Sequence, residues 1–305
     1  MFLDRYIDSG WTLAVRKNIP DGQLFQSDDK RPFYAIKNPW RYWCADPFLF
    51  NYKGTEYIFC EAFDIFKDKG VIAYRIIGEN GKVSKLYPCL ECEGHLSYPN
   101  IFEHDGQIYM VPESGDANEI ALYKAIQFPD KWEKAAVLVK DVAACDTNLI
   151  SYNNATYLLT VIIDKNQSQY SYDSLYLYVL NGDCFEKCEN SVAVCDAEYA
   201  RNGGNMFYDK EYLYRVSQNC KDMYGENLNF LAVDKISSTH YEEHLTKKVS
   251  LSDIEVAGNK RYDGIHTYNF DLQYEIIDLQ KKKWFRIERF LYLVMNKFKH
   301  NTIQR

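Results

Sequence analysis

Two stretches of the chain share one pattern of residues, and each ends in a glutamate at the same position. In the first, Asp46 stands at position zero and Glu61 at position fifteen, with Pro at one, Phe at four, Gly at eight and Tyr at eleven. The second begins at Tyr98, repeats those intermediate residues at the same offsets and ends in Glu113. Carboxyl groups that share one pocket perturb each other's pKa and can act as general acid and general base.

Two looser copies of this unit follow. One begins at Asp146 and has Ile at four, Asn at eight and Tyr at eleven. The other begins at Arg201 and has Asp at eight and Tyr at eleven. The unit therefore recurs roughly every 50 residues, which is typical of the blades of a β-propeller.

Each copy has the pattern of a β-hairpin, in which two apolar strands flank a turn. Positions zero and fifteen are expected to face each other across the hairpin, at the same end of the sheet. In a propeller the first strand of each blade lines a central channel, so these positions are expected to converge on one pocket. The residues concerned are Asp46, Glu61, Tyr98, Glu113, Asp146 and Arg201.

A fifth segment, residues 263–280, contains GIHTYNF followed by YEIIDL. We expect its blade to close with the N-terminal strand 11–16, which would fasten the ring. Gln218 ends the second strand of the fourth blade and His266 begins the fifth, so both are expected to complete the lining. We predict an all-β fold, a five-bladed β-propeller over residues 1–280 with a short C-terminal helix.

Composition narrows the class of protein. The 305 residues are 47% apolar and 16% aromatic, which suits one large β domain, and the net charge of −7 argues against a nucleic-acid groove. The N-terminal residues lack the basic and apolar regions of a signal peptide, and the nine cysteines are an odd number. We therefore expect a cytoplasmic protein with free thiols.

A zinc site is the alternative interpretation of two cysteine clusters. Cys89, Cys92 and His95 form one cluster, and Cys184 and Cys188 form the other. The clusters lie about 90 residues apart without a second tight pair, so ordinary cysteines are the favoured interpretation. We predict no metal and no cofactor.

The last 25 residues differ from the rest of the chain. Residues 281–305 hold eight Lys or Arg against one Glu, a net charge of +7. Trp284, Ile287, Leu291, Val294 and Phe298 follow helical spacing, with most cations on the other face. We predict a basic amphipathic helix that meets an anionic membrane surface, that packs across the propeller with its basic side in water, or that docks a partner.

Several long sequence segments resemble the N-terminal domain of glucosamine inositolphosphorylceramide transferases. That domain also occurs in bacterial proteins from polysaccharide loci. The segments are ADPFLF, HLSYPNIFEHDGQIYMVPES, FPDKW, CDTNLISY, ARNGGN, YLYRVSQ, YGENL and GIHTYN, in this order, and they lie between about residues 40 and 270. That domain is similar in turn to the five-bladed propellers of glycoside hydrolase family 43. In the plant proteins a separate C-terminal domain carries the sugar transfer, so the resemblance alone leaves the activity open.

The propeller relatives imply roles for single residues. They place a general base at the position of Asp46 and a second Asp, which tunes pKa and orients the acid, at that of Asp146. Their general acid is a Glu that opens a later blade, where this chain has Arg201. Because a glycosidic oxygen leaves poorly until it is protonated, the proton donor would have to be Glu113 or Glu61.

Each candidate also has a structural interpretation. Asp46 could cap a turn, and Glu61 and Glu113 could bond the backbone of a neighbouring blade. Arg201 could neutralise Asp146, or hold a phosphate or a sugar carboxylate. A buried histidine such as His266 is often a satisfied core residue. Tyr98 and Trp43, which could form walls on which a sugar stacks, could instead be packing.

The leading hypothesis is a carbohydrate-active enzyme that builds or trims a cell-surface polysaccharide or glycolipid. Its substrate would be a sugar, a sugar nucleotide or a glycolipid, and it would lie in the cytoplasm, peripheral at the inner face of the membrane. The alternative is a non-catalytic glycan-binding or scaffolding propeller that assists a partner glycosyltransferase.

Overall fold

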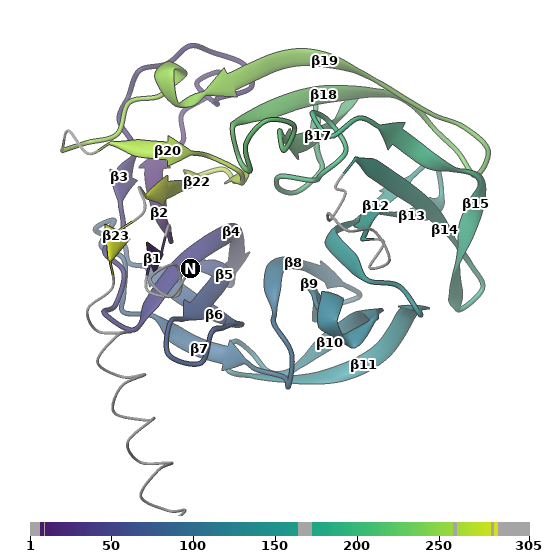
Figure 1. Ribbon diagram of the computed structural model, residues 1–305, viewed down its shortest axis with the longest axis horizontal. Helices are drawn as coiled ribbons and strands as arrows, with labels where there is room; N and C mark the ends of the chain where they lie inside the picture. The colour runs from purple at the N-terminus through teal and green to yellow at the C-terminus, as the bar shows by residue number, and fades with distance from the viewer. Residues whose placement is uncertain (1–6, 9, 164–172, 259–260, 282–283, 286–305) are drawn as a thin grey trace, which may run out of the picture.

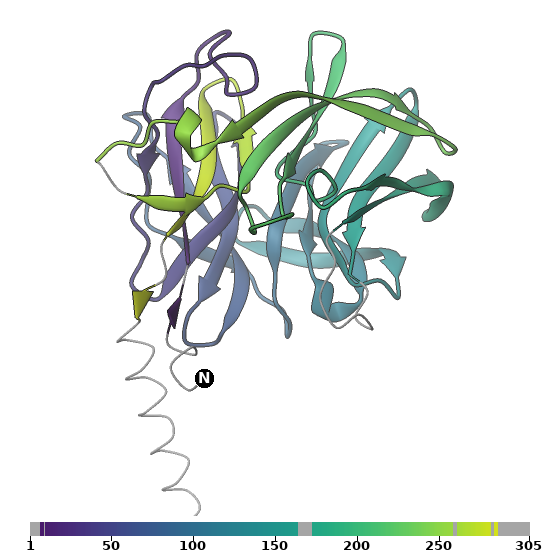
Figure 2. The same ribbon diagram turned by 45° about the horizontal axis from the view of Figure 1, so that its top comes forward.

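The computed structural model describes residues 7–8, 10–163, 173–258, 261–281 and 284–285. Five antiparallel sheets are arranged radially about one axis, with the first strands of the first three blades, β4, β8 and β12, nearest the axis (Figure 1). The predicted all-β, five-bladed propeller is therefore confirmed. Figure 2 shows the same blades from a tilted view, with the strands running along the axis and turns at both ends.

Blades one to four each use four strands that are consecutive in sequence. Blade one consists of β4 (Tyr42–Tyr52), β5 (Thr55–Asp64), β6 (Lys69–Ile77) and β7 (Tyr87–Leu90). Blade two consists of β8 (Ser97–His104), β9 (Gln107–Glu113), β10 (Glu119–Gln127) and β11 (Lys131–Lys140). Blade three consists of β12 (Ala144–Tyr152), β13 (Ala155–Ile162), β14 (Ser174–Asn181) and β15 (Cys184–Cys195). Blade four consists of β16 (Phe207–Asp209), β17 (Tyr212–Gln218), β18 (Asn227–Ile236) and β19 (Tyr241–Ser250).

Blade five joins the two ends of the propeller. It contains β20 (Tyr262–Gly264), β21 (Tyr268–Phe270) and β22 (Tyr274–Lys281) from the C-terminal part, with β2 (Trp11–Lys17) and β3 (Tyr34–Ala35) from the N-terminal part. β2 pairs antiparallel with β22 over its whole length, from Trp11 opposite Gln280 to Lys17 opposite Tyr274. The expected closure by the N-terminal strand is confirmed, and it ties the propeller without a covalent link.

The predicted C-terminal helix does not begin at residue 281. Lys281 ends β22, and β23 (Trp284–Phe285) pairs with β1 (Ile7–Asp8) in a two-stranded sheet outside the blades. The rest of the predicted helix, residues 282–283 and 286–305, lies outside the described residues. The described residues contain no α-helix, only the 3-10 turns η2 (Gly115–Ala117) and η3 (Leu251–Asp253), so none of their helices could cross a membrane.

The core lies between adjacent blades. Phe48 and Phe59 of blade one pack with Met110 of blade two, and Val111 of blade two packs with Leu158 of blade three. The other three blade interfaces are built in the same way. Because burying one large apolar side chain contributes about 1.5–3 kcal/mol, these interfaces hold the blades at fixed angles. A site at the axis is therefore supported by rigid walls.

The first hairpins of blades one to three share a bulge at position zero. Ala45 pairs with Glu61, but the next pair is Phe48 with Phe59, so one residue of β4 is extra. The same shift follows Ser97 in β8 and Cys145 in β12. Position fifteen therefore faces the residue before position zero, and our expectation that zero and fifteen are paired was wrong by one residue.

Candidate active site

The residue at position zero has the same unusual backbone in blades one to three. The φ angles of Asp46, Tyr98 and Asp146 are 49°, 44° and 49°. This left-handed region is uncommon for residues other than glycine, and such residues persist where the surrounding structure holds them, often at functional sites. The bulges place these three residues at the inner end of their blades, where the hydrogen bonds described below join them across the axis.

Asp46 lies at the centre of a buried hydrogen-bond network. Its Oδ2 accepts the backbone N–H of Tyr98 at 3.2 Å, and its Oδ1 accepts the hydroxyl of Thr267 at 2.9 Å. His266 Nε2 lies 3.4 Å from Oδ1. Asp46 is only 5% exposed, and burial raises its pKa to about 7, although His266 opposes the shift. A carboxyl group in this condition changes its protonation state near neutral pH.

His266 is held by Asp278 of β22. Asp278 Oδ1 accepts the backbone N–H groups of His266 and Thr267 at 3.1 and 2.9 Å, and its Oδ2 lies 2.6 Å from His266 Nδ1, out of line with the ring N–H. Trp11 stacks on the imidazole at 3.8 Å. Burial alone would lower the pKa of His266, but the carboxylates of Asp278 and Asp46 outweigh it and hold the pKa above its ordinary value.

Asp146 and Arg201 form a buried ion pair between blades three and four. Asp146 Oδ2 accepts hydrogen bonds from Arg201 Nε and, at 3.1 Å, from Gln218 Nε2. The two charged residues are 1% and 7% exposed. The position where the resemblance places a general acid therefore carries a cation that neutralises Asp146, one of the two uses expected for Arg201.

Of the two candidate acids, Glu113 is half-buried and Glu61 is buried. Glu113 Oε2 accepts the backbone N–H of Asp146 at 3.2 Å, so Glu113 bonds the neighbouring blade as the structural interpretation expected. Burial and the Asp146 carboxylate raise the pKa of Glu113 to about 8, although Arg201 opposes the shift. The Asp46 carboxylate adds to this rise in the pKa of Glu113.

Glu61, at the matching place in blade one, contacts a different group. His95 Nδ1 accepts the backbone N–H of Gly70 at 3.0 Å, which leaves the ring hydrogen on Nε2. That nitrogen lies 3.2 Å from Glu61 Oε1. The Glu61 charge also helps to raise the pKa of Asp46, so Glu61 borders the same site.

The two aromatic candidates are held by packing. Tyr98 is fully buried, and its hydroxyl both accepts the N–H of Gly204 at 2.9 Å and donates to the carbonyl of Gly204 at 2.8 Å. Tyr98 therefore joins blade two to the segment that opens blade four. The Trp43 ring stacks on Phe63 at 4.5 Å and lies against Gly10. Both positions favour the structural interpretation of these residues over stacking on a sugar.

The segment between β17 and β18 covers one side of the network. Its Tyr224 is 36% exposed and lies with its ring centroid 5.3 Å from that of His266. The guanidinium carbon of Arg201 lies 4.9 Å from the centre of the same ring. A cation over an aromatic face is attracted by the ring quadrupole, so Tyr224 helps to hold Arg201 in place.

Among the described residues, two groups of side chains have the residue types of a metal site. Asp46, His266 and Asp278 form one, and Glu113, Cys145 and Asp146 form the other. In the first, both oxygens of each carboxylate already lie beside hydrogen-bond donors. In the second, Arg201 already neutralises Asp146 and would repel a metal ion. The hydrogen bonds of the first group and the Arg201 charge beside the second both disfavour a resident metal.

The sequence prediction missed four residues of this site: Thr267, Asp278, His95 and Tyr224. Asp278 lies twelve residues after His266, so it does not follow the offset of fifteen that revealed Glu61 and Glu113. His95 and Tyr224 lie in segments that connect strands, where no repeat operates. Two sequence segments could have indicated two of these residues: GIHTYN contains Thr267, and YGENL contains Tyr224.

A family model for the N-terminal part of glucosamine inositolphosphorylceramide transferase 1 matches residues 37–288. The chain belongs to this family. Among curated members, the glucosamine inositolphosphorylceramide transferase 1 of Oryza sativa subsp. indica is 30% identical over 240 residues, and that of Arabidopsis thaliana is 28% identical over 245 residues. Each alignment covers 75% of this chain but only 31% and 30% of the relative, so the family resemblance concerns about a third of those proteins.

Solved structures show the same fold at low sequence identity. A family 62 α-L-arabinofuranosidase from Coprinopsis cinerea is 11% identical with a TM-score of 0.56, over 89% of this chain and 98% of that one. A family 117 glycoside hydrolase from Zobellia galactanivorans is 14% identical with a TM-score of 0.53, over 93% of this chain and 98% of that one. These similarities establish the fold of the family member described here.

Proposed function

We propose that the protein is a carbohydrate-active enzyme that transfers or cleaves a glycosidic bond in the biosynthesis of a cell-surface polysaccharide or glycolipid. The observation that carries this proposal is the pair of carboxyl groups at the axis, Asp46 and Glu113, whose pKa values of about 7 and about 8 flank a slightly alkaline pH. Two titratable groups in one site with displaced pKa values are a pattern typical of acid and base catalysts.

The roles follow from these pKa values. Glu113 has the higher pKa of the two, so it would hold the proton while Asp46 is ionised. Glu113 would donate its proton to the leaving glycosidic oxygen as the bond to the anomeric carbon breaks. Asp46 would take the proton of the attacking water or hydroxyl as its oxygen forms the new bond. Asp146 would keep the pKa of Glu113 raised, with its own charge paired to Arg201. Exchange with solvent would then return a proton to Glu113 and remove the one that Asp46 has taken.

The proposed substrate is a sugar, a sugar nucleotide or a glycolipid. Arg201 and His266 would face its anionic or hydroxyl groups, since a guanidinium and an imidazole are the cationic groups beside Asp46 and Asp146. The curated relatives are named as transferases for glucosamine and inositolphosphorylceramide, which supports a place in glycolipid biosynthesis.

The second candidate function is a non-catalytic propeller that binds a glycan and assists a partner glycosyltransferase. It is favoured by the engagement of Asp46, whose two oxygens already accept hydrogen bonds from Tyr98 and Thr267. Arg201 at the place of the acid also favours it.

The test is a screen of the purified protein against a panel of sugar nucleotides and activated glycosides, with Asp46→Asn beside it. Turnover by the parent and a loss of at least about 100-fold in the variant support the enzyme, because general acid–base catalysis contributes about 10²–10⁴-fold. Asp105→Asn is the matched control, since Asp105 has the same φ of 49° in an exposed turn. Equal turnover by Asp46→Asn and the parent would remove the catalytic role, and binding by the parent without turnover would favour the second function.

We further propose that the protein acts in the cytoplasm, at the inner face of the membrane, through the basic residues of the C-terminal segment. The support is the net charge of +7 over residues 281–305. The test is sedimentation with anionic vesicles before and after deletion of residues 286–305, which leaves β22 and β23 in place. Equal sedimentation of the two forms would end the membrane proposal.

A further inference from the structure

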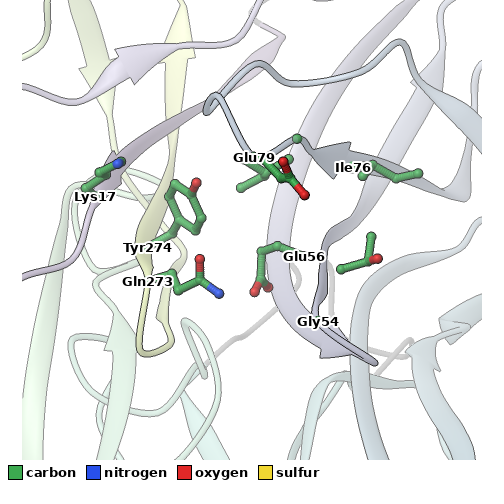
Figure 3. A pocket seen from close by; sticks show the side chains of 10 residues that line it. Lys17, Gly54, Glu56, Ile76, Glu79, Gln273 and Tyr274 are labelled. Carbon is green, nitrogen blue, oxygen red and sulfur yellow. The ribbon is translucent and has the colours of Figure 1, made fainter.

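A cavity lies between blades five and one, at the opposite end of the blades from Asp46. It has a volume of about 420 Å³ and is lined by residues of the β4–β5 turn, the end of β6, the end of β2 and the start of β22. Figure 3 shows the carboxylates of Glu56 and Glu79 and the amide of Gln273 around this space. The volume falls within the range of about 300–1,000 Å³ in which proteins bind small molecules.

Glu56 is the unusual group in this cavity. It is only 3% exposed, its Oε2 accepts the amide of Asn51 at 3.0 Å, and its Oε1 has no hydrogen-bond donor among the described residues. Burial and the neighbouring carboxylate of Asp271 raise the pKa of Glu56 to about 8, although Asn51 opposes the shift. Below that pH Glu56 holds a proton that it can share with Asp271, and the pair of carboxyl groups keeps one negative charge that a cation would offset.

The blade itself does not require this carboxylate. Glu56 lies ten residues after position zero and pairs with Asn51 across the hairpin. The matching residue in blade two is Ile108, which pairs with Glu103 and is 4% exposed, and in blade three it is Thr156. An apolar or hydroxyl side chain therefore serves the fold at this place, so Glu56 is free to serve a ligand.

We propose that this cavity binds a small organic amine, with its ammonium group against Glu56 Oε1. Lys17 also lines the cavity, but in the described part of the chain no ion pair joins Glu56, Asp271 or Glu79 to a Lys, Arg or His. Ile76, Ile77 and Tyr274 offer an apolar wall for a carbon skeleton. The space is also much larger than a bare metal ion needs, which favours an organic cation. This proposal is independent of the axial site and of the proposed function.

The test is calorimetric titration of the full chain with cyclohexylamine and with cyclohexanol, which differ only in the ammonium group, and with calcium chloride as a third probe. We expect the amine to bind at least ten times more tightly than the alcohol or calcium. Equal binding of amine and alcohol would overturn the proposal. Binding of calcium as tight as that of the amine would also overturn it, in favour of a metal site.

Variants of Glu56 assign the binding to this cavity. Glu56→Gln keeps the shape and removes the charge, so it should weaken amine binding at least ten-fold, while Glu103→Gln in the matching hairpin of blade two should leave it unchanged. Glu56→Ile copies blade two and should bind as weakly as Glu56→Gln; if it fails to fold, Glu56→Gln still decides. Unchanged amine affinity in Glu56→Gln would refute the assignment.

Discussion

Asp278 of the last blade accepts the backbone N–H of Asp46 in the first blade, with Oδ2 and N 2.9 Å apart. The same carboxylate holds the backbone of His266 and Thr267. Strand β22, which closes the propeller by pairing with β2, therefore also holds the candidate base Asp46 in its left-handed backbone conformation. Closure of the ring and order at the axis should for this reason depend on one side chain.

Asp278→Asn tests this dependence. The amide keeps the shape but loses the charge that holds three backbone N–H groups, and hydrogen bonds to charged groups are worth about 1.5–3 kcal/mol. We expect denaturant unfolding to show a stability loss of about 2 kcal/mol or more and any turnover to fall. Asp253→Asn, which changes an exposed cap of η3, should lose less than 1 kcal/mol. Equal losses in the two variants would show that Asp278 has no special role.

Glu113→Gln tests the assignment of the acid. With Asp46 near pKa 7 and Glu113 near pKa 8, the rate should pass through a maximum between these values, because the base must be ionised and the acid protonated. The two values describe an interacting pair, so the profile reports the pair as a whole.

In Glu113→Gln the rate should fall about 10²–10⁴-fold and the alkaline limb of the pH–rate profile should disappear. Glu119→Gln, which alters a carboxylate on the next strand that pairs with Lys134, should keep both limbs. A Glu113→Gln variant that retains the alkaline limb would move the acid to another residue.

Much of the fold could be predicted from the recurrence of one hairpin. The Pro, Phe, Gly and Tyr of blades one and two recur in part in blades three and four because these blades use a similar hairpin, and four such units with a fifth strand segment imply a closed ring. That recurrence was enough to predict that the following residues lie together at one axis: Asp46, Glu113, Asp146, Arg201 and His266.

The rest depends on contacts that no local pattern encodes. Tyr98 occupies the same backbone position as Asp46, yet its ring extends into the core and binds Gly204, more than 100 residues away. Gly204 has a φ of 142°, and a Cβ there would lie 2.0 Å from the carbonyl oxygen of Tyr268. The partner of Tyr98 is thus set by how closely blades four and five approach, which appears only in three dimensions.

Stability should decrease as pH rises from about 5 to about 8.5. Asp46, Glu113 and Glu56 have raised pKa values of about 7, 8 and 8 in the folded protein. A raised pKa stabilises the folded state fully below the unfolded value, near 4, and the benefit is lost as pH rises through the folded value. The raised pKa of His266 acts in the same direction.

Carboxylates with lowered pKa, such as Asp64 and Glu91, act in a different range. Their contribution is present above their unfolded values and is lost only as the pH falls below about 4. Thermal unfolding should therefore show a higher Tm at pH 5.5 than at pH 8.5, and Asp46→Asn should reduce the difference. A Tm that rises over this range would show that these acids are ionised in the folded protein.

The buried pair of Arg201 and Asp146 gives the sharpest test of the network. Arg201→Met leaves Asp146 buried with Gln218 as its remaining side-chain donor, and breaking a buried ion pair costs about 3–5 kcal/mol. Adding Asp146→Asn removes the stranded charge, so the double variant should recover much of that loss although it carries one more change.

The double-mutant cycle is completed by Asp146→Asn alone, and the stability of each variant is measured by denaturant unfolding at pH 7. Arg16→Met, which strands the buried Glu275 at the opposite end of β2 from Trp11, should cost stability without altering ligand binding or turnover at the axis. If the two single losses simply add in the double variant, the pair is not coupled, and Arg201 would be available to hold an anionic group of the substrate instead.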